Sequence, residues 1–213
     1  MTSVSARDLS IAIVSYNTRA VLLDCLRSVF ETSGKVTVEV ILVDNNSHDG
    51  TTEAVREQYP TMQLIVNQQN RGFAKAVNQA LEMSCGRYLL LLNSDTRLHP
   101  HALEHMVTCL DREAGIGAVG CKQWTEDGRM YQSCFPFPSV RDHLTYAALF
   151  RTCAPRLQGA LASKRAIDCS QSQDVDWING ACLMVRRDLM KACAGLDEGY
   201  FMYFGSSRNR VGE

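Results

Sequence analysis

The sequence predicts an α/β fold in which helices flank a mostly parallel sheet. Apolar runs typical of strands alternate with amphipathic stretches typical of helices four times before Asp95, as in right-handed βαβ units. The run at residues 88–92 is wholly apolar, which favours a strand buried on both faces. Polar residues follow three of the apolar runs, so candidate ligand groups are expected at the carboxyl ends of the strands, where open α/β sheets bind ligands.

Length, composition and charge narrow the class of protein. The 213 residues suit one large domain or two small ones, and a hydrophobic content of 46% is ordinary for a globular protein. A formal charge of −1 argues against a general nucleic-acid binder, which usually carries a basic excess. The chain shows no apolar stretch of the roughly 20 residues that span a bilayer, and its first ten residues lack the apolar core of a signal peptide. We therefore expect a cytoplasmic protein without a transmembrane segment.

The cysteines give a second indication of the compartment. Nine of them are scattered along the chain, without a Cys-x-x-Cys pair and without Cys/His spacing typical of zinc sites. This pattern favours reduced thiols in the core of a cytosolic protein.

The first half of the chain is expected to follow a regular order. Residues 9–15 are β-branched and apolar and predict a strand, after which Thr18 is expected to cap a helix that ends near Gly34. Further strands are predicted at residues 36–43, 63–66 and 88–92, and further helices at residues 51–59 and from Phe73 to about Gly86.

The second half is less regular. Its expected features are a helix from Pro100 to Arg112, a short strand at residues 116–120 and a hairpin turn at residues 126–129. Prolines, an apolar patch and basic residues make residues 136–173 hard to assign. For the apolar patch at residues 144–150, an amphipathic helix packed on the sheet is the first expectation, and a surface that faces an acceptor or a membrane is the alternative.

The polar loop at residues 44–51 does not match the EF-hand, and the common phosphate-binding motifs are absent from the chain. It is not an EF-hand, because Asp49 stands at the sixth position, where glycine is required, and Val55 stands at the twelfth. No Walker A motif occurs in the chain, and no G-x-G-x-x-G follows the first strand. Asp44, at the strand end, is placed to accept hydrogen bonds from a sugar hydroxyl or a base edge. For Asp49, a tight turn that caps the next helix is the favoured interpretation.

The loop after the leucine run contains the candidate metal ligands. Asn93, Ser94 and Asp95 each carry a side-chain oxygen. A carboxylate in this position is where a hard cation and a phosphate would meet. The alternative is that Asn93 and Asp95 only turn the chain toward the next helix.

Four motifs together resemble family 2 glycosyltransferases with the GT-A (Rossmann-like) fold, in particular the bacterial rhamnosyltransferase-like members. They are IVSYN at 13–17, VDNNSHDGT at 43–51, NRGFAKAVNQAL at 70–81 and LLLNSDT at 90–96. Each motif alone is weak, but their order and spacing are specific. The resemblance implies an inverting, metal-dependent transferase that moves a sugar from a UDP- or dTDP-linked donor to a glycan or glycolipid hydroxyl. In the family, such reactions serve bacterial polysaccharide and cell-envelope synthesis.

The resemblance also implies which residues form the site. The nucleotide-sugar-binding residues would be Ser15, Tyr16, Asn17, Asp44, Asn70, Gly72, Phe73, Ala74, Asn78, Asn93 and Ser94. Asp95 would bind Mg²⁺ or Mn²⁺, and Asn93 stands where the family's Asp-x-Asp motif usually has its first aspartate. Trp177, Asn179 and Gly180 resemble an acceptor-side block of the family, although a tryptophan in the core is the alternative for Trp177.

The catalytic base is not assigned by this resemblance. Residues 195–204 match the segment that leads to the base, but Gly205 and Ser206 stand where the family has a Glu-Asp pair, and Asp197 and Glu198 come too early to replace it. We expect a single GT-A-like domain over residues 1–213, incomplete at its C-terminus. Its expected parts are a nucleotide-sugar-binding half at 9–96, an acceptor-side half at 97–204 and a disordered polar tail at 205–213.

Two classes of function therefore stay open. The first is an active glycosyltransferase; the second is a nucleotide-sugar-binding fragment that transfers sugar slowly or not at all because the base is missing. A nucleotidyltransferase is disfavoured because such enzymes usually carry a Gly-rich loop with a basic residue after the first strand. Nucleic acid is not expected as a partner, whereas self-association and peripheral contact with the inner face of the membrane remain open.

Overall fold

The computed structural model describes residues 7–137 and 172–201, which belong to two compact units. The first unit runs to Cys121 and resumes at Gly180, and the second is Lys122–Asn179. The expectations for the apolar patch at 144–150 and for the tail at 205–213 lie outside the described residues.

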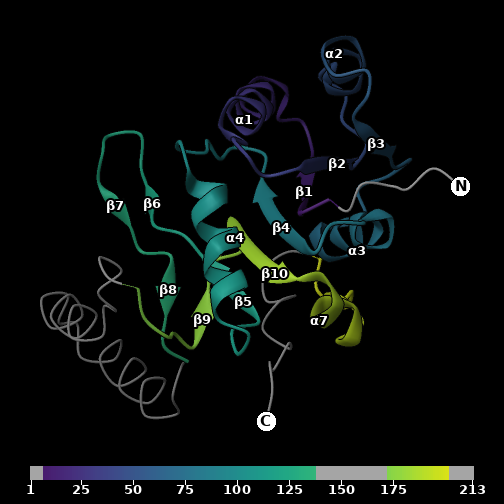
Figure 1. Ribbon diagram of the computed structural model, residues 1–213. Helices are drawn as coiled ribbons and strands as arrows, with labels where there is room; N and C mark the ends of the chain where they lie inside the picture. The colour runs from purple at the N-terminus through teal and green to yellow at the C-terminus, as the bar shows by residue number, and fades with distance from the viewer. Residues whose placement is uncertain (1–6, 138–171, 202–213) are drawn as a thin grey trace, which may run out of the picture. The chain divides into compact units, whose positions relative to one another are not determined.

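A six-stranded sheet forms the centre of the first unit (Figure 1). Its strands, in spatial order, are β3 (Gln63–Val66), β2 (Val38–Asp44), β1 (Leu9–Ser15), β4 (Tyr88–Asn93), β10 (Cys182–Arg186) and β5 (Ala118–Gly120). The first four are parallel to one another, and β10 is antiparallel to both of its neighbours. The predicted α/β fold with a mostly parallel sheet is confirmed.

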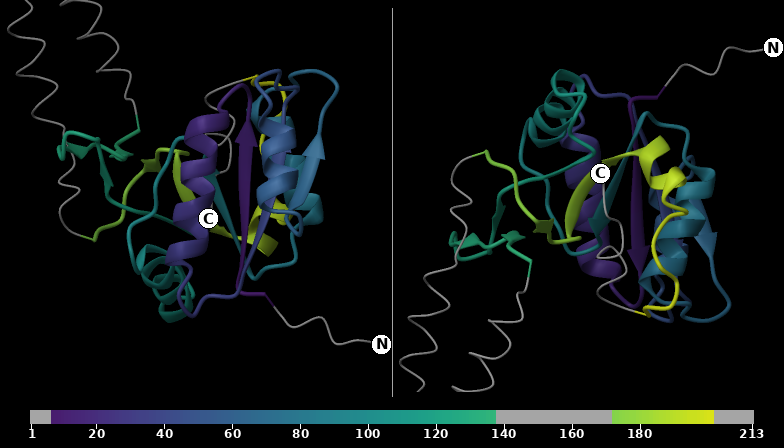
Figure 2. Two further views of the ribbon diagram at one scale, coloured as in Figure 1. Left: turned by 90° about the horizontal axis from the view of Figure 1, so that it is seen from above. Right: turned by 90° about the horizontal axis from the view of Figure 1, so that it is seen from below.

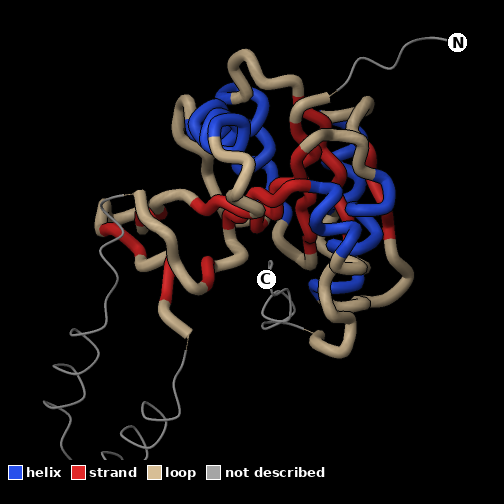
Figure 3. Tube along the Cα trace, turned by 60° about the horizontal axis from the view of Figure 1, so that its bottom comes forward, coloured by secondary structure: helices blue, strands red, loops and turns tan. Residues whose placement is uncertain are grey.

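Helices cover both faces of this sheet (Figures 2 and 3). They are α1 (Arg19–Thr32), α2 (Thr51–Gln58), α3 (Phe73–Met83), α4 (Ala102–Arg112) and α7 (Arg187–Ala192). Apolar side chains of α1, α2 and α4 form one cluster with Ile11, Leu42 and Leu90. Because side chains alternate between the faces of a strand, the neighbouring positions face the opposite side, where α3 packs on β1 and β2.

The leucines of β4 are buried on both faces, as the sequence predicted. Leu90 and Leu92 belong to the cluster with α1, whereas Leu89 and Leu91 alternate with them, and none of the four is more than 2% exposed. Because β4 is packed on both faces, its position in the sheet is fixed. The polar residues that follow it therefore lie next to the end of β1.

The start of α1 differs from the expectation in one respect. The helix begins at Arg19, so Thr18 is the N-cap residue, but its side chain makes no capping hydrogen bond. The Thr18 hydroxyl instead lies 3.0 Å from the Ser15 hydroxyl. The first N–H of the helix, that of Arg19, instead donates to the Asp49 side chain in the loop after β2.

The second unit contains two small antiparallel pairs of strands. β6 (Gln123–Trp124) pairs with β7 (Met130–Tyr131) through the predicted hairpin turn, in which Gly128 has φ 77°. β8 (Cys134–Phe135) pairs with β9 (Trp177–Ile178), and the rings of Phe135 and Trp177 stack at 4.3 Å between their centroids.

The functional halves expected at 9–96 and 97–204 remain predictions. In the structure, α4, β5, β10 and α7, all from the second of these ranges, belong to the first unit and complete its sheet and helical layers. Within the described parts of the chain, none of the helices has the length and apolar character needed to cross a membrane.

The expectation of reduced cysteines is wrong at one position. Cys134 is disulfide-bonded, whereas six other described cysteines are free thiols. Sequence spacing could not show this, because it does not reveal which cysteines meet in space. Among the free thiols, burial raises the pKa of Cys25 to about 12, so this thiol stays protonated.

Candidate functional site

The three polar loops predicted from the sequence begin at adjacent strand ends. Ser15 at the end of β1 is the register partner of Asp44 at the end of β2. One position earlier, Val14 pairs with Asn93 at the end of β4. The parallel register therefore brings the residues after β1, β2 and β4 to one edge of the sheet.

Hydrogen bonds join the loops after β1 and β2 into one surface. The Asn45 N–H donates to the Ser15 carbonyl at 2.8 Å, and the Asn17 N–H donates to the Ser47 hydroxyl at 2.8 Å. In return, the His48 N–H donates to the Asn17 side-chain oxygen at 2.8 Å. Asn17 has φ 53°, a left-handed conformation that asparagine tolerates better than most residues. Tyr16, between these contacts, is 48% exposed.

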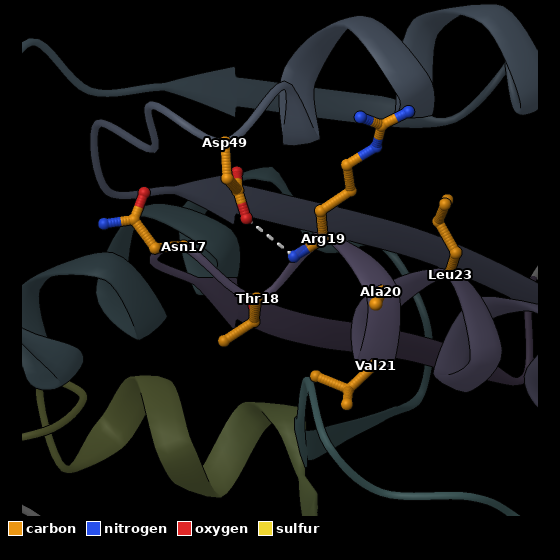
Figure 4. Close-up of a pocket in the computed structure, with 7 residues that line it drawn as sticks. All are labelled: Asn17, Thr18, Arg19, Ala20, Val21, Leu23 and Asp49. Atoms are coloured by element: carbon orange, nitrogen blue, oxygen red, sulfur yellow. Dashed lines mark hydrogen bonds between the residues drawn. The ribbon is translucent and has the colours of Figure 1, made fainter.

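Asp49 connects the N-termini of two helices. Its Oδ2 accepts the Arg19 N–H at the start of α1 at 2.9 Å (Figure 4), and its Oδ1 accepts the Thr51 N–H at the start of α2 at 3.1 Å. Burial works against the charged form, but hydrogen bonds from Thr51 and Arg19 outweigh it and lower the pKa of Asp49. The favoured interpretation of Asp49 as a turn and cap is confirmed. The carboxylate also borders a shallow hollow that is lined by residues 17–21 and Leu23 (Figure 4).

We expect Asp49→Ala to lower the free energy of unfolding by about 1–2 kcal/mol, because two helix N-termini lose an acceptor. Urea denaturation followed by circular dichroism measures this loss. Asp49→Asn keeps an acceptor oxygen and should lose less. Because the folded-state pKa lies below the ordinary value of 3.8, this stabilisation is present above that pH and is lost as the pH falls through the folded-state pKa. An Asp49→Ala protein as stable as the parent at pH 7 would contradict the prediction.

Asp44 is fully buried, and one of its carboxylate oxygens is unsatisfied. Oδ2 accepts the Ser47 N–H at 2.8 Å, and the Asp44 main-chain carbonyl accepts the Asn67 N–H at 2.8 Å. Within the described part of the chain, Oδ1 is buried and has no hydrogen-bond partner. A buried, unpaired carboxylate oxygen is unfavourable, so a donor from outside the described residues is the expected partner.

The loop after β3 is held in a turn that leads into α3. The Gly72 N–H donates to the Asn70 side-chain oxygen at 3.0 Å. Gly72 has φ 82°, and a Cβ atom there would lie 2.6 Å from the carbonyl oxygen of Phe201. Phe73 donates its N–H to this same carbonyl at 2.8 Å. The glycine therefore accommodates a close approach by the protein's own chain, and its predicted place in the ligand pocket stays a prediction.

Three buried or half-buried amides, which we call the amide relay, support the other side of this turn. The relay consists of Asn45, Asn67 and Gln79. Asn45 donates to the Gly72 carbonyl at 3.2 Å and accepts from the Asn67 side chain at 2.9 Å. Asn67 and Gln79 exchange two hydrogen bonds of 2.9 and 3.0 Å. The relay was not predicted from the sequence, although Asn67 directly follows a predicted strand, as the polar residues of the other loops do.

Two of the expected nucleotide-sugar residues are not available in this arrangement. Ala74 is 2% exposed and packs in the core. The side chain of Asn78 is engaged by Leu196 and Glu198, from the segment that follows α7. Their contribution to a ligand pocket therefore stays a prediction, and any role of Asn78 acts through the segment it holds.

The loop after β4 presents oxygen ligands at the sheet edge. The Asn93 N–H donates to the Ala181 carbonyl at 2.9 Å, which fixes the start of the loop against β10. Ser94 is 8% exposed, and the Asp95 side chain is exposed. Among residues 7–137 and 172–201, no group of three or more His, Cys, Asp or Glu side chains is gathered. One carboxylate and one amide oxygen suit Mg²⁺ or Mn²⁺ if water and phosphate complete the coordination.

The predicted acceptor-side residues belong to both units. Trp177 and Asn179 belong to the second unit, where the Trp177 indole N–H donates to the Pro136 carbonyl at 3.2 Å and the Asn179 N–H to the Ser133 carbonyl at 2.8 Å. Trp177 is 41% exposed, which does not fit the alternative of a core tryptophan. Gly180 is the first residue of the chain that returns to the first unit. Their acceptor-side role stays a prediction.

Solved structures share this fold, which is the GT-A fold of glycosyltransferases. The mannosyltransferase PcManGT from Pyrobaculum calidifontis, in complex with GDP-Man and Mn²⁺, superposes with a TM-score of 0.58 at 21% identity, covering 92% of this chain and 49% of that one. S. aureus TarS 1-349 in complex with UDP superposes with a TM-score of 0.61 at 18% identity, covering 95% and 53%.

The chain belongs to glycosyl transferase family 2, whose sequence model matches residues 10–171. The N-acetylglucosaminyl-diphospho-decaprenol L-rhamnosyltransferase of Mycobacterium tuberculosis is 30% identical over 177 residues, which cover 78% of this chain and 57% of that protein. The putative teichuronic acid biosynthesis glycosyltransferase TuaG of Bacillus subtilis is 28% identical, covering 91% and 74%. The chain thus spans little more than half the length of the rhamnosyltransferase it resembles.

Proposed function

We propose that this chain binds a nucleoside-diphosphate sugar at the ends of β1, β2 and β4 for transfer of the sugar, with inversion, to an acceptor hydroxyl. The single observation that carries the proposal is the buried Oδ1 of Asp44, which lacks a donor within the described residues and lies where the loops after β1 and β2 meet. PcManGT and TarS, which share the fold, are solved with GDP-Man and UDP, and this supports a nucleotide at the corresponding edge.

The base of the nucleotide is proposed to bind between the first two loops. A ring N–H of uracil or thymine would donate to Asp44 Oδ1 and remove its unsatisfied state. Because Asp44 is fully buried, the residues that cover it must yield slightly when the base enters. The exposed ring of Tyr16 is available to cover the base, since aromatic faces pack well on planar groups.

The diphosphate is proposed to lie toward Asn93 and Asp95. These two residues would hold Mg²⁺ or Mn²⁺ through oxygen atoms, and the ion would stabilise the negative charge on the departing diphosphate. The anchoring of Asn93 to Ala181 keeps this loop in place before the ligand arrives. Protein groups that are already held in place lose less conformational freedom when the nucleotide and metal bind, so this anchor favours affinity.

The metal proposal makes a specific prediction for binding. Mn²⁺ should raise the affinity for UDP or dTDP much more than the affinity for uridine or thymidine, because one carboxylate and one amide leave most coordination positions to water and phosphate. Isothermal titration calorimetry with the four ligands, with and without Mn²⁺, measures both effects. Asp95→Asn should remove the enhancement and leave nucleoside affinity unchanged. Equal enhancement of nucleoside and diphosphate binding would count against the assignment.

The acceptor and sugar are proposed from the family relatives. The name of the M. tuberculosis relative specifies rhamnose as the sugar and a lipid diphosphate that carries N-acetylglucosamine as the acceptor. A dTDP-linked deoxysugar and a polyprenyl-linked glycan acceptor at the cytoplasmic face of the membrane are therefore the proposed substrates, in synthesis of a cell-envelope glycan.

Binding of the nucleotide sugar without efficient transfer is a second candidate function. The two carboxylates closest to the end of the described chain favour this second function. Both already accept hydrogen bonds from other groups of the protein, so neither stands ready to act as the general base. Asp197 Oδ1 accepts the Gly199 N–H at 2.9 Å, and Glu198 Oε1 accepts the Asn78 amide at 3.0 Å. An assay of nucleoside-diphosphate release, with and without a lipid-linked glycan, separates the candidates: acceptor-dependent release supports transfer, and binding without release supports the second.

A further inference from the structure

The segment Gly195–Phe201 lies along α3, and one side chain of the helix holds its main chain. Asn78 Oδ1 accepts the Leu196 N–H at 2.8 Å, and Asn78 Nδ2 donates to the Leu196 carbonyl at 3.0 Å. The same Nδ2 donates to Glu198 Oε1 at 3.0 Å. A single amide thus satisfies both main-chain groups of Leu196, much as a neighbouring strand would.

The fit around Asn78 is close. Gly195 has φ 76°, and a Cβ atom at this position would collide with Asn78 Oδ1, so that glycine alone suits both the conformation and the space. Leu196 is 4% exposed. Asparagine is a poor residue for a helix interior compared with alanine, so its use in the middle of α3 is explained by these contacts rather than by helix formation.

The far end of the same segment reaches the turn before α3. The carbonyl of Phe201 accepts the N–H of Phe73, the first residue of the helix, at 2.8 Å. On the other side of this turn, Asn45 of the amide relay donates to the Gly72 carbonyl at 3.2 Å. The peptide unit between Gly72 and Phe73 is therefore held at its oxygen by the relay and at its nitrogen by Phe201.

We propose that Asn78 is a positioning residue for the donor site. By holding Leu196 it fixes the Gly195–Phe201 segment on α3, and through the Phe201 carbonyl this segment holds the turn at Asn70–Phe73. The inference rests on the proposed function in one point: Asn45, which holds this turn through the Gly72 carbonyl, directly follows Asp44, the residue proposed to bind the base. Loss of the Asn78 contacts frees the segment, so the Phe201 carbonyl no longer holds the Phe73 N–H. The turn is then held only by Asn45 of the amide relay and can move.

Asn78→Asp tests the contact with little change in volume. The carboxylate can still accept the Leu196 N–H, but it cannot donate to the Leu196 carbonyl, and it faces Glu198 with like charge. Adding Glu198→Gln to this variant removes the repulsion and supplies an amide that can donate to the new carboxylate. The matched control is Glu82→Gln, a change of one charge at an exposed position of the same helix.

Native-state hydrogen exchange by NMR, without nucleotide, directly measures how firmly Asn78 and Phe201 hold the Leu196 and Phe73 amides. In Asn78→Asp at neutral pH, the Phe73 and Leu196 amides should exchange at least about tenfold faster, while the core amide of Leu90 is unchanged. The double variant should recover most of the protection, and Glu82→Gln should match the parent. Unchanged exchange at Phe73 would overturn the proposal, and so would a uniform acceleration of all amides, because that indicates global destabilisation.

Titration with UDP and dTDP then tests the link to the donor site. Affinity should fall at least about tenfold in Asn78→Asp and return in the double variant. If exchange responds as expected but affinity does not, the positioning role is overturned. If the parent binds neither nucleotide, the proposed function fails. The exchange result needs no ligand, so it still shows separately whether Asn78 holds the turn.

Discussion

Replacing Asp44 with alanine is expected to weaken binding of UDP or dTDP by about 1–3 kcal/mol, the cost of losing a hydrogen bond to a buried group. The physical reason is the state of its two oxygens: Oδ2 accepts the Ser47 N–H, whereas Oδ1 has no hydrogen-bond partner among the described residues and can accept a donor from the base. Calorimetric titration of the parent and variant with each nucleotide measures the difference.

Asp44→Asn is the matched control for this experiment. It preserves the volume and can retain the acceptor for Ser47, but it then presents an N–H₂ group where the base would donate. We expect it to bind uracil and thymine nucleotides as poorly as Asp44→Ala while folding at least as stably as the parent. Parent-like affinity in Asp44→Ala for every nucleotide tested would show that the base binds elsewhere.

Glu39→Ala is expected to lower the free energy of unfolding by about 3 kcal/mol at pH 7, because it leaves the buried Ser10 hydroxyl and the partly buried donors of Cys85 and Arg7 without an acceptor. Glu39 is 4% exposed at the start of β2, the end of the strand opposite to Asp44. Oε1 accepts the Ser10 hydroxyl at 2.5 Å and the Cys85 N–H at 2.8 Å. Oε2 accepts the Arg7 guanidinium at 2.8 Å. Urea denaturation measures the loss, and Glu39→Gln, which keeps the volume, should lose less.

The same carboxylate gives the stability a pH dependence. Burial works to raise the pKa of Glu39, but hydrogen bonds from Ser10 and Cys85 outweigh it, so the pKa lies below the ordinary value of 4.5. Its stabilisation is therefore present above that value and is lost as the pH falls through the lower, folded-state pKa. The difference between the parent and Glu39→Ala should shrink on acidification. A difference that stays constant from pH 7 to acid pH would show that Glu39 does not remain ionised in the fold.

The regular part of the fold was predictable because local patterns determine it. The leucines of β4 are apolar without alternation, and such a run has few stable places other than a doubly covered strand. The positions of Asp44 and Asp95 followed from the rule that ligand groups gather at carboxyl strand ends. The role of Asp49 was also readable, because aspartate before glycine is a frequent turn and cap.

The remaining features depend on contacts between residues distant in sequence. The amide relay exists because the register of β2 and β3 brings Asn45 and Asn67 together, and no local pattern encodes that register. Asn78 lies on the predicted helix, yet its partner Leu196 comes more than a hundred residues later. The unsatisfied oxygen of Asp44 is likewise a property of the assembled loops and not of the strand that carries it.

The pairing of β5 with β10 has a consequence for how such a protein can change. Gly120 pairs with Leu183, so the chain leaves the first unit at Cys121 and comes back at Gly180 on directly adjacent antiparallel strands. In connectivity this is a β-hairpin whose turn has been replaced by a whole unit. Insertions and deletions within residues 122–179 therefore leave the register of the six strands untouched. We therefore expect natural variation or deliberate grafting in this region to leave Asp44, Asn93 and Asp95 in place.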